Sequence, residues 1–121
     1  MSHKILVVDD QALVRNLFRK TLEASGYTVY TAEHGKFGWE AAKKEKYDLI
    51  LTDLNMPYIN GMDMITLIRD GSTNADTTII MISSDATADR KLKAKEVGAN
   101  GWITKPVQKD QLLKLVQHIL K

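Results

Sequence analysis

Short apolar or β-rich runs alternate five times with stretches of helical spacing along this chain. Such runs, here three to six residues long, indicate strands buried in a sheet. Strands are expected at 4–8, 27–32, 49–51, 77–82 and 101–104. Helices are expected at 11–25, 35–46, 61–70, 87–97 and 110–120. This alternation predicts an α/β fold, a doubly wound three-layer sandwich in which a five-stranded parallel sheet carries helices on both faces.

The central run, Y-D-L-I-L-T-D-L-N-M-P, extends from Tyr47 to Pro57. Its apolar part is closed by Asp53, and Pro57 ends any continuation of the strand. Asp53 is therefore expected at the carboxyl end of a buried strand, the edge of open α/β sheets where ligands bind. Considered alone, Asp53 could instead simply begin a turn, a common position for Asp.

Length and composition favour one domain over 1–121, because 121 residues with 44% hydrophobic side chains suffice for one packed core. The net charge of +2 comes from 17 basic and 15 acidic residues without a dense basic block, which argues against nucleic acid and membrane as partners. No segment approaches the ~20 apolar residues of a membrane span. The absence of Cys excludes thiolate metal sites. We expect a cytoplasmic monomer without signal peptide or output domain.

Several local features refine the expected helices. The first helix is expected to carry one apolar face. The residues of that face are Leu13, Val14, Leu17, Phe18, Thr21 and Leu22. Gly26 and Gly98 are expected to stop the first and fourth helices. Gly38 weakens the second helix, and the polar run 71–76 is interpreted as a loop. No spacing among the histidines suggests a metal site, and all three, His3, His34 and His118, are expected at the surface.

Polar residues follow four of the expected strands where the apolar runs end. They are Asp9 and Asp10 after the first strand, Asp53 after the third, Ser83 after the fourth and Lys105 after the fifth. Because the carboxyl ends of parallel strands share one edge, these side chains should converge. Three neighbouring carboxylates repel one another, and oxygen ligands without His or Cys favour a hard cation such as Mg²⁺. With an ammonium and a hydroxyl nearby, such a site suits a phosphoryl group on a carboxylate oxygen.

Simpler interpretations remain open for each residue considered alone. The pair Asp9-Asp10 could cap the helix that follows. Lys105 could be a solvated surface lysine, and Trp102 could be a packing residue.

Six motifs, in this order, resemble those of the receiver domain of two-component response regulators over essentially the whole chain. They are V-V-D-D, L-T-D-L-N-M-P, N-G, I-S-S, G-A-N-G-W and T-K-P. The resemblance implies a flavodoxin-like sheet of strand order 2-1-3-4-5. It also implies that Asp53 is the phosphoacceptor, that Asp10 ligates Mg²⁺ directly and Asp9 through water, and that Asn55 adds its backbone carbonyl.

Further roles follow from the same resemblance. Ser83 and Lys105 would bind the phosphoryl group, and Trp102 would be the aromatic switch residue. A cis peptide is expected between Lys105 and Pro106. Asn55 and Asp85 would tune hydrolysis of the phosphorylated form. Two departures from the family pattern, Trp102 for the commoner Tyr or Phe and Val107 for Phe, are expected to affect partner choice or switching.

The function implied by the resemblance is that of a single-domain response regulator and not of an enzyme. A histidine kinase would phosphorylate it, and it would then bind a separate target, with the flagellar motor switch of chemotaxis preferred. The alternative is a phosphorelay intermediate that passes phosphate to a histidine phosphotransfer protein. A phosphatase of the haloacid-dehalogenase type would need a second Asp two residues after its nucleophile at the first strand, where Asp9 is followed by Asp10, Gln11 and Ala12. A degenerate receiver that only binds partners is disfavoured by the intact acidic set.

Overall fold

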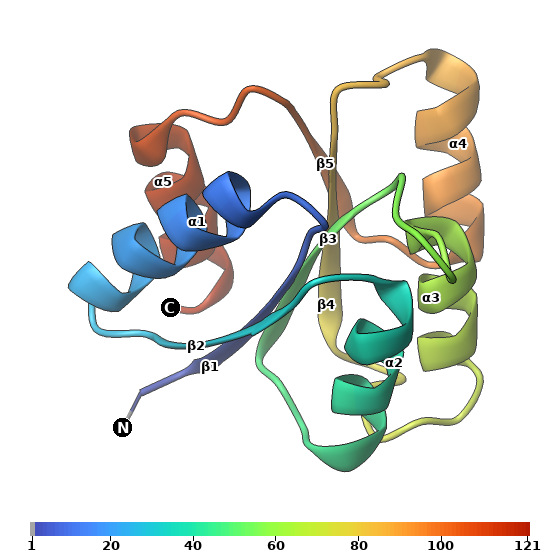
Figure 1. The fold of residues 1–121 in the computed structure, drawn as a ribbon, viewed down its shortest axis with the longest axis horizontal. Helices are drawn as coiled ribbons and strands as arrows, with labels where there is room; N and C mark the ends of the chain where they lie inside the picture. The colour runs from blue at the N-terminus through green and yellow to red at the C-terminus, as the bar shows by residue number, and fades with distance from the viewer. Residues whose placement is uncertain (1) are drawn as a thin grey trace.

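Five parallel strands form one sheet in the computed structural model, which describes residues 2–121 (Figure 1). The strands are β1 (Lys4–Val8), β2 (Thr28–Ala32), β3 (Leu49–Asp53), β4 (Thr78–Ser83) and β5 (Gly101–Thr104). The helices are α1 (Ala12–Ala24), α2 (Gly35–Lys44), α3 (Gly61–Arg69), α4 (Ala88–Val97) and α5 (Lys109–Ile119). The strand order is β2-β1-β3-β4-β5. The expected fold class, strand order and alternation are confirmed, with boundaries that differ by at most two residues.

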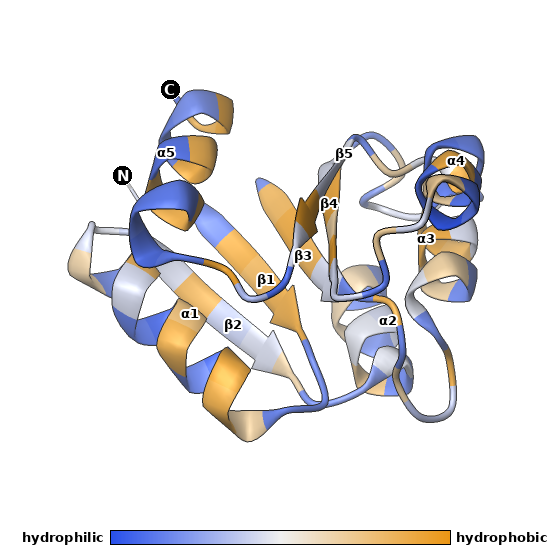
Figure 2. Ribbon diagram, turned by 90° about the horizontal axis from the view of Figure 1, so that it is seen from above, coloured by the Kyte–Doolittle hydropathy of each residue, from blue (hydrophilic) through white to orange (hydrophobic). Residues whose placement is uncertain are grey.

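Helices cover both faces of the sheet, as Figure 1 shows: α1 and α5 lie on one side, and α2, α3 and α4 on the other. Each side has its own apolar core. Phe18, Leu22, Leu112 and Val116 pack against one face, whereas Ile65, Ile68 and Ala94 belong to the cluster on the other. Every residue of β3 is buried, which explains its continuous apolar run. In Figure 2 the apolar residues accordingly concentrate on the central strands of the sheet.

The apolar face expected for α1 is wider than the part that the sheet covers. Phe18, Thr21 and Leu22 are buried, but Leu13 is 85% exposed and Leu17 is 38% exposed. Sharing one helix face with Phe18 and Leu22 therefore does not make these two leucines part of the core. Residues 13 and 17 lie one turn apart at one margin of the stripe, so they can both reach solvent while the rest packs inward.

The structure explains why glycine occupies two positions in the helices. Gly98 adopts φ +115° at the end of α4, where its N–H bonds to the carbonyls of Ala94 and Lys95, so it stops the helix as expected. Gly38, which weakens α2 by propensity, lies where an added Cβ would come within 2.9 Å of Val8 Cγ1. Its presence is therefore explained by the close approach of α2 to the sheet.

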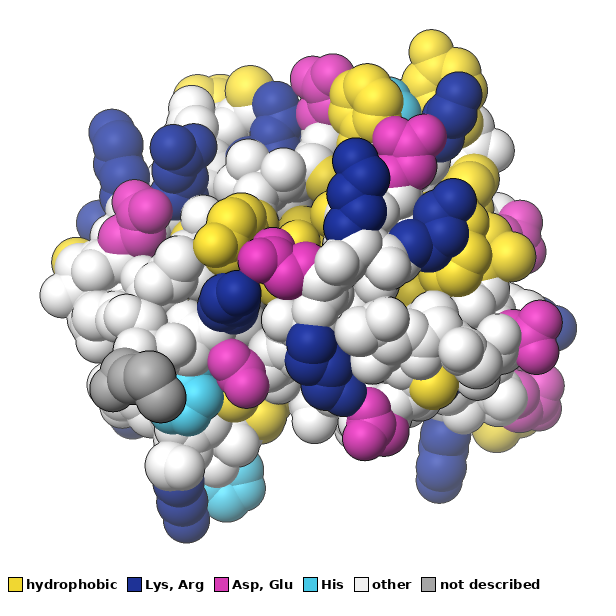
Figure 3. Space-filling view, turned by 90° about the horizontal axis from the view of Figure 1, so that it is seen from below, with side chains coloured by type: hydrophobic (Ala, Val, Ile, Leu, Met, Phe, Trp, Pro, Cys, Tyr) yellow, Lys and Arg dark blue, Asp and Glu magenta, His cyan; other side chains and the backbone are white. Residues whose placement is uncertain are grey.

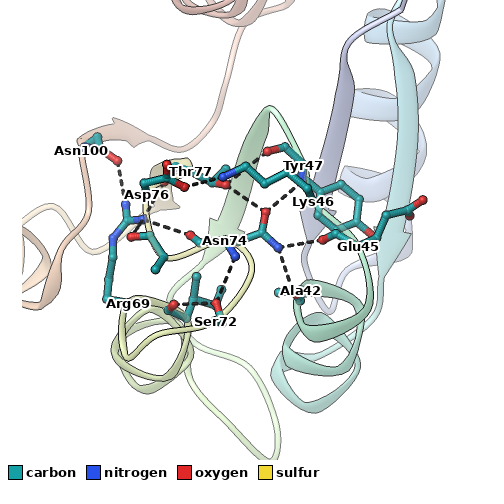
Figure 4. Close-up of polar contacts among 12 residues, drawn as sticks. Ala42, Glu45, Lys46, Tyr47, Arg69, Ser72, Asn74, Asp76, Thr77 and Asn100 are labelled. Atoms are coloured by element: carbon teal, nitrogen blue, oxygen red, sulfur yellow. Dashed lines mark hydrogen bonds and ion pairs between the residues drawn. The ribbon is translucent and has the colours of Figure 1, made fainter.

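A buried polar network closes the sheet edge at the amino ends of the strands (Figure 4). Asn74, fully buried within the run expected to be only a loop, accepts the N–H of Tyr47 at 2.8 Å and the Thr77 hydroxyl at 2.9 Å. Its amide donates to the carbonyls of Ala42 and Glu45 at 2.7 and 2.8 Å. Asn74 thus ties the end of α2 to the start of β3 and β4.

The Arg69 side chain forms a second set of hydrogen bonds next to those of Asn74. The guanidinium donates to the carbonyls of Ala75 and Thr77 at 2.9 and 2.7 Å, and to Gly98 O and Asn100 Oδ1 at 2.9 and 2.8 Å. These bonds hold the ends of α3 and α4 against the loop before β4.

Candidate phosphoryl and metal site

Strand register places the acidic residues side by side. Val8 pairs with Thr52, so Asp9 lies level with Asp53 at the carboxyl edge of neighbouring strands. Asp53 pairs with Ile82, and Ser83 follows one residue later. The sequence expectation that residues from separate strands converge at one rim is therefore met by the backbone.

Three carboxylates gather at this rim. One oxygen from each of Asp9, Asp10 and Asp53 lies within 4.8 Å of the others. Asp9 and Asp53 are only 2% and 8% exposed, whereas Asp10 is open to solvent. An all-oxygen donor set that is buried on one side and open on the other fits a hard divalent cation that keeps part of its water shell.

Lys105 supplies the positive charge of the site. Its Nζ lies 2.9 Å from Asp9 Oδ2 and 3.5 Å from Asp53 Oδ2, and its side chain is 17% exposed. It is therefore not the solvated surface lysine of the simpler interpretation. The peptide bond between Lys105 and Pro106 is cis, as the resemblance implied.

The electrostatics of the rim act most strongly on Asp53. Burial, and next the negative charge of Asp9, raise the pKa of Asp53 to about 6. Lys105 and the Leu54 N–H, which donates to Asp53 Oδ1 at 2.9 Å, oppose this rise in the pKa. A cation bound among the three carboxylates would favour the ionised Asp53, the form that can act as a nucleophile.

Asp9 is held in place by backbone and side-chain bonds. Its Oδ1 accepts the N–H of Gln11 at 2.9 Å, which holds the turn into α1. The N-cap residue of α1 is Gln11 and no side chain caps the helix, so the capping interpretation was wrong. Arg15 donates from Nη1 to the Asp9 carbonyl at 2.7 Å, and the Asp9 N–H bonds to Ala32 O. Arg15 was not singled out from the sequence, because its contact depends on how α1 leaves the sheet.

Ser83 and Asp85 form the next part of the rim. Ser83 is 1% exposed, and its hydroxyl accepts the N–H of Asp85 at 3.1 Å. The Asp85 carboxylate lies 3.4 Å from Nε of Arg90 in the first turn of α4. The Ser83 hydroxyl is thus linked to α4 through its hydrogen bond with Asp85 and the ion pair between Asp85 and Arg90.

Two expected site residues make no side-chain hydrogen bond with the carboxylates or with Lys105 among residues 2–121. Asn55 is exposed in the loop after β3, and the structure records no side-chain hydrogen bond for it among the described residues. Trp102 pairs with Met81 in the sheet and packs against the core under α2, α3 and α4. Its buried Nε1 has no hydrogen-bond partner among residues 2–121.

His34, expected to be a surface residue, is half-buried. Its Nδ1 accepts the Phe37 N–H at the start of α2.

Comparison with known proteins gives a consistent result. The family model described as "Response regulator receiver domain" matches residues 5–117. Chemotaxis protein CheY1 of Helicobacter pylori is 34% identical over 119 residues, which are 97% of this chain and 96% of that protein. The crystal structure of chemotaxis response regulator CheY4 of Vibrio cholerae superposes with a TM-score of 0.93 at 35% identity, covering 99% of this chain and 100% of that one.

Relatives with a longer architecture also match. The cell cycle transcriptional regulator CtrA of Caulobacter vibrioides is 30% identical over 118 residues, which are 98% of this chain and 50% of that protein. The chain thus spans about half the length of this relative. Among the described residues, no helix is both long and apolar enough to span a bilayer.

Proposed function

The chain belongs to the family of response regulator receiver domains, signalling domains that take phosphate from histidine kinases, and we propose that it is a stand-alone response regulator phosphorylated on Asp53. The observation that carries this proposal is the rim itself. Asp53 lies beside Asp9 and Asp10 within ligand distance of one cation, and Lys105 reaches both Asp9 and Asp53. Phosphoryl transfer requires little beyond such positioning and charge neutralisation.

In the proposed reaction an oxygen of Asp53 forms a bond to phosphorus while the P–N bond of a phosphohistidine breaks. The electron pair of that bond stays on the imidazole nitrogen, which takes a proton from water. Asp9, Asp10, Asp53 and the carbonyl of Asn55 would hold Mg²⁺, which supplies charge neutralisation on the phosphoryl oxygens. Lys105 would pair with the phosphoryl group, and the Ser83 hydroxyl would donate its hydrogen to it while still accepting the Asp85 N–H.

The phosphorylated form would act on a separate target through the surface of α4, β5 and α5. Movement of Ser83 would pull on Asp85 and through it on α4, and Trp102 would repack. The phosphoryl group shifts the equilibrium only through contacts that differ between the two states. Asn55 and Asp85, at the rim, would tune the lifetime of the phosphorylated state.

A chemotaxis role is the favoured target assignment, supported by the CheY1 and CheY4 relatives. The chain itself offers a matching surface, because α4 exposes four basic side chains beside a groove that Trp102 lines. These are Arg90, Lys91, Lys93 and Lys95. They suit an acidic segment of a motor switch protein. On the face shown in Figure 3, by contrast, basic and acidic side chains are interspersed, and we propose no nucleic-acid or membrane partner there.

A second candidate, the phosphorelay intermediate, is favoured by a different observation. An apolar groove between α1 and the loop after β5 opens beside Lys105. It is lined by Gln11, Val14, Leu17, Phe18, Ser84, Lys105, Pro106 and Val107. A phosphotransfer protein that brings a histidine to Asp53 must rest on surfaces next to the rim, and this groove is one of them. In both roles we expect a cytoplasmic monomer.

The test begins with acetyl phosphate and Mg²⁺. Intact-mass spectrometry should show the gain of one phosphoryl group on the wild type and none on Asp53→Asn. Purified motor switch protein and purified histidine phosphotransfer protein should then be assayed for binding, with and without beryllofluoride. Stronger binding of the former with beryllofluoride supports chemotaxis, and phosphate exchange with the latter supports a phosphorelay. A wild type that gains no mass refutes the proposal.

A further inference from the structure

Gly61, the second residue of the N-G motif, lies directly against the backbone of the phosphoacceptor. A Cβ added to Gly61 would lie 2.3 Å from the carbonyl oxygen of Asp53 and 3.1 Å from Leu54 Cα. These are backbone atoms of a buried strand end, so they cannot turn aside as a flexible side chain can. The positive-φ glycines are Gly26, Gly71 and Gly98. Gly61 is therefore needed for space and not for an unusual backbone conformation.

The atoms that Gly61 touches control the direction of the Asp53 carboxylate. The Gly61 N–H donates to Leu54 O at 2.8 Å. The Leu54 N–H, part of the Asp53–Leu54 peptide, donates to Asp53 Oδ1 at 2.9 Å. The other carboxylate oxygen, Oδ2, is then turned toward Lys105. A displaced Asp53 carbonyl would rotate this peptide and redirect its N–H.

The rest of the loop keeps Gly61 in this position. The Asn60 side chain accepts the Asp63 N–H at 2.9 Å and so fixes the first turn of α3. At the α2 side, a Cβ on Gly35 would lie 1.7 Å from Ile59 O, so this loop also touches α2 through a glycine. The start of α3 is therefore held between α2 and the end of β3.

We propose that Gly61 is a positioning residue for phosphoryl transfer: by lacking a side chain it lets α3 begin against the Asp53–Leu54 peptide, and this contact aims the Asp53 carboxylate. The inference rests on the proposed function, since it assigns Gly61 to the reaction at Asp53. The roles proposed for the acidic residues and for Lys105 do not explain the N-G motif. The contact of Gly61 with the Asp53–Leu54 peptide explains it.

The expected effect follows from the distances. A methyl group at 2.3 Å from an oxygen must move away by about 1 Å to reach ordinary contact, and part of that shift falls on Asp53. A misplacement of about 1 Å at a reacting group can lower a rate by up to about 100-fold. Gly61→Ala should accordingly slow phosphorylation by about 10- to 100-fold at saturating Mg²⁺ and acetyl phosphate.

Gly38→Ala is the matched control. Its Cβ would meet Met64 Sδ at 2.8 Å and Val8 Cγ1 at 2.9 Å, so it also overpacks the interior but presses on side-chain atoms and not on the Asp53–Leu54 backbone. Both variants should unfold at lower urea concentration than the wild type. Only Gly61→Ala should lose phosphorylation rate and Mg²⁺ affinity, measured by mass spectrometry and by titration calorimetry on protein shown to be folded by circular dichroism.

Equal phosphorylation rates and equal Mg²⁺ affinities in folded Gly61→Ala and wild type would overturn the inference, as would equal losses in both glycine variants. If Gly61→Ala does not fold, trimethylamine N-oxide should be added to favour its compact state. If it still does not fold, Gly35→Ala decides, because it displaces the same loop from the side of α2. An unphosphorylated wild type would refute the proposed function instead, and the Mg²⁺ affinities would still test the role of Gly61.

Discussion

Asp53→Asn should stabilise the protein at neutral pH in the absence of divalent cations. The pKa of Asp53 is raised from 3.8 to about 6, mainly by burial and by the charge of Asp9. The native state therefore binds the Asp53 proton more tightly than the unfolded chain does. Stability contributed by this proton is complete below about pH 4 and is lost as the pH rises through about 6.

The size of the effect follows from this pKa difference. Two pKa units correspond to about 3 kcal/mol, which is the free energy that the ionised carboxylate removes from folding above about pH 7. Asn has nearly the shape of the carboxylate without its charge, so it should recover most of this free energy. Because Asp53 is 8% exposed, solvent screens little of it.

Urea unfolding in EDTA across the range from about pH 4 to about pH 7.5 provides the assay. The difference in unfolding free energy between Asp53→Asn and the wild type should grow from near zero to about 3 kcal/mol as the pH rises. Addition of Mg²⁺ should stabilise the wild type more than the variant, by about 2.7 kcal/mol at 100 times its dissociation constant. A difference that is constant across this pH range, or a less stable variant at pH 7, would show that the repulsion inferred at the rim is absent.

Three further substitutions test other parts of the structure. Lys105→Met should raise the pKa of Asp53 further above about 6, because the charge of Lys105 lowers the pKa of that carboxyl. Carbon-13 NMR titration of the Asp53 carboxyl would measure the change, and an unchanged pKa would contradict the short Lys105 contact. Asn74→Ala removes four hydrogen bonds from a fully buried side chain and should reduce the unfolding free energy in urea by ~3 kcal/mol or more, whereas a loss below ~1 kcal/mol would mean that the network is replaced by water. Thr21→Val should raise stability by about 1 kcal/mol, because the buried Thr21 hydroxyl has no partner among the described residues and Val keeps its shape; thermal unfolding would detect a drop instead if that hydroxyl were satisfied.

The rim could be predicted from the sequence because parallel strands impose it. Once 4–8 and 49–51 are interpreted as strands of one parallel sheet, Asp9 and Asp53 must end on the same edge, and the observed register places them level. The place of Lys105 at the same edge followed from the same rule. Its contacts with both carboxylates did not, because β4 lies between its strand and β3. The sequence alone left open whether Asp9 caps the first helix. The structure decides against this, because Asp9 accepts the N–H of Gln11, which precedes the helix, and no side chain caps α1.

Features set by contacts between distant segments could not be predicted in the same way. Asn74 lies in a run whose composition is that of any polar loop, and only folding brings Ala42 and Glu45 to its amide. The exposure of Leu13 depends on how far the sheet extends beneath α1, which periodicity does not specify. The need for glycine at 61 likewise arises from a contact with Asp53, eight residues earlier, across a loop whose path the sequence does not fix.

The two edges of the sheet differ in how their polar groups are satisfied, and this difference suits a switch. At the amino edge Asn74 and Arg69 direct their hydrogen bonds to carbonyl and amide oxygens, so buried polar groups there are paired without opposed like charges. At the carboxyl edge Asp9 and Asp53 are buried together with one Lys between them, which leaves a net negative site. A cation or phosphoryl group therefore changes the free energy at the carboxyl edge, and we expect the amino edge to keep its hydrogen bonds. Because a ligand shifts a conformational equilibrium only by its differential affinity, rearrangement should be concentrated in the loops at the carboxyl edge, including the one that links Ser83 to α4.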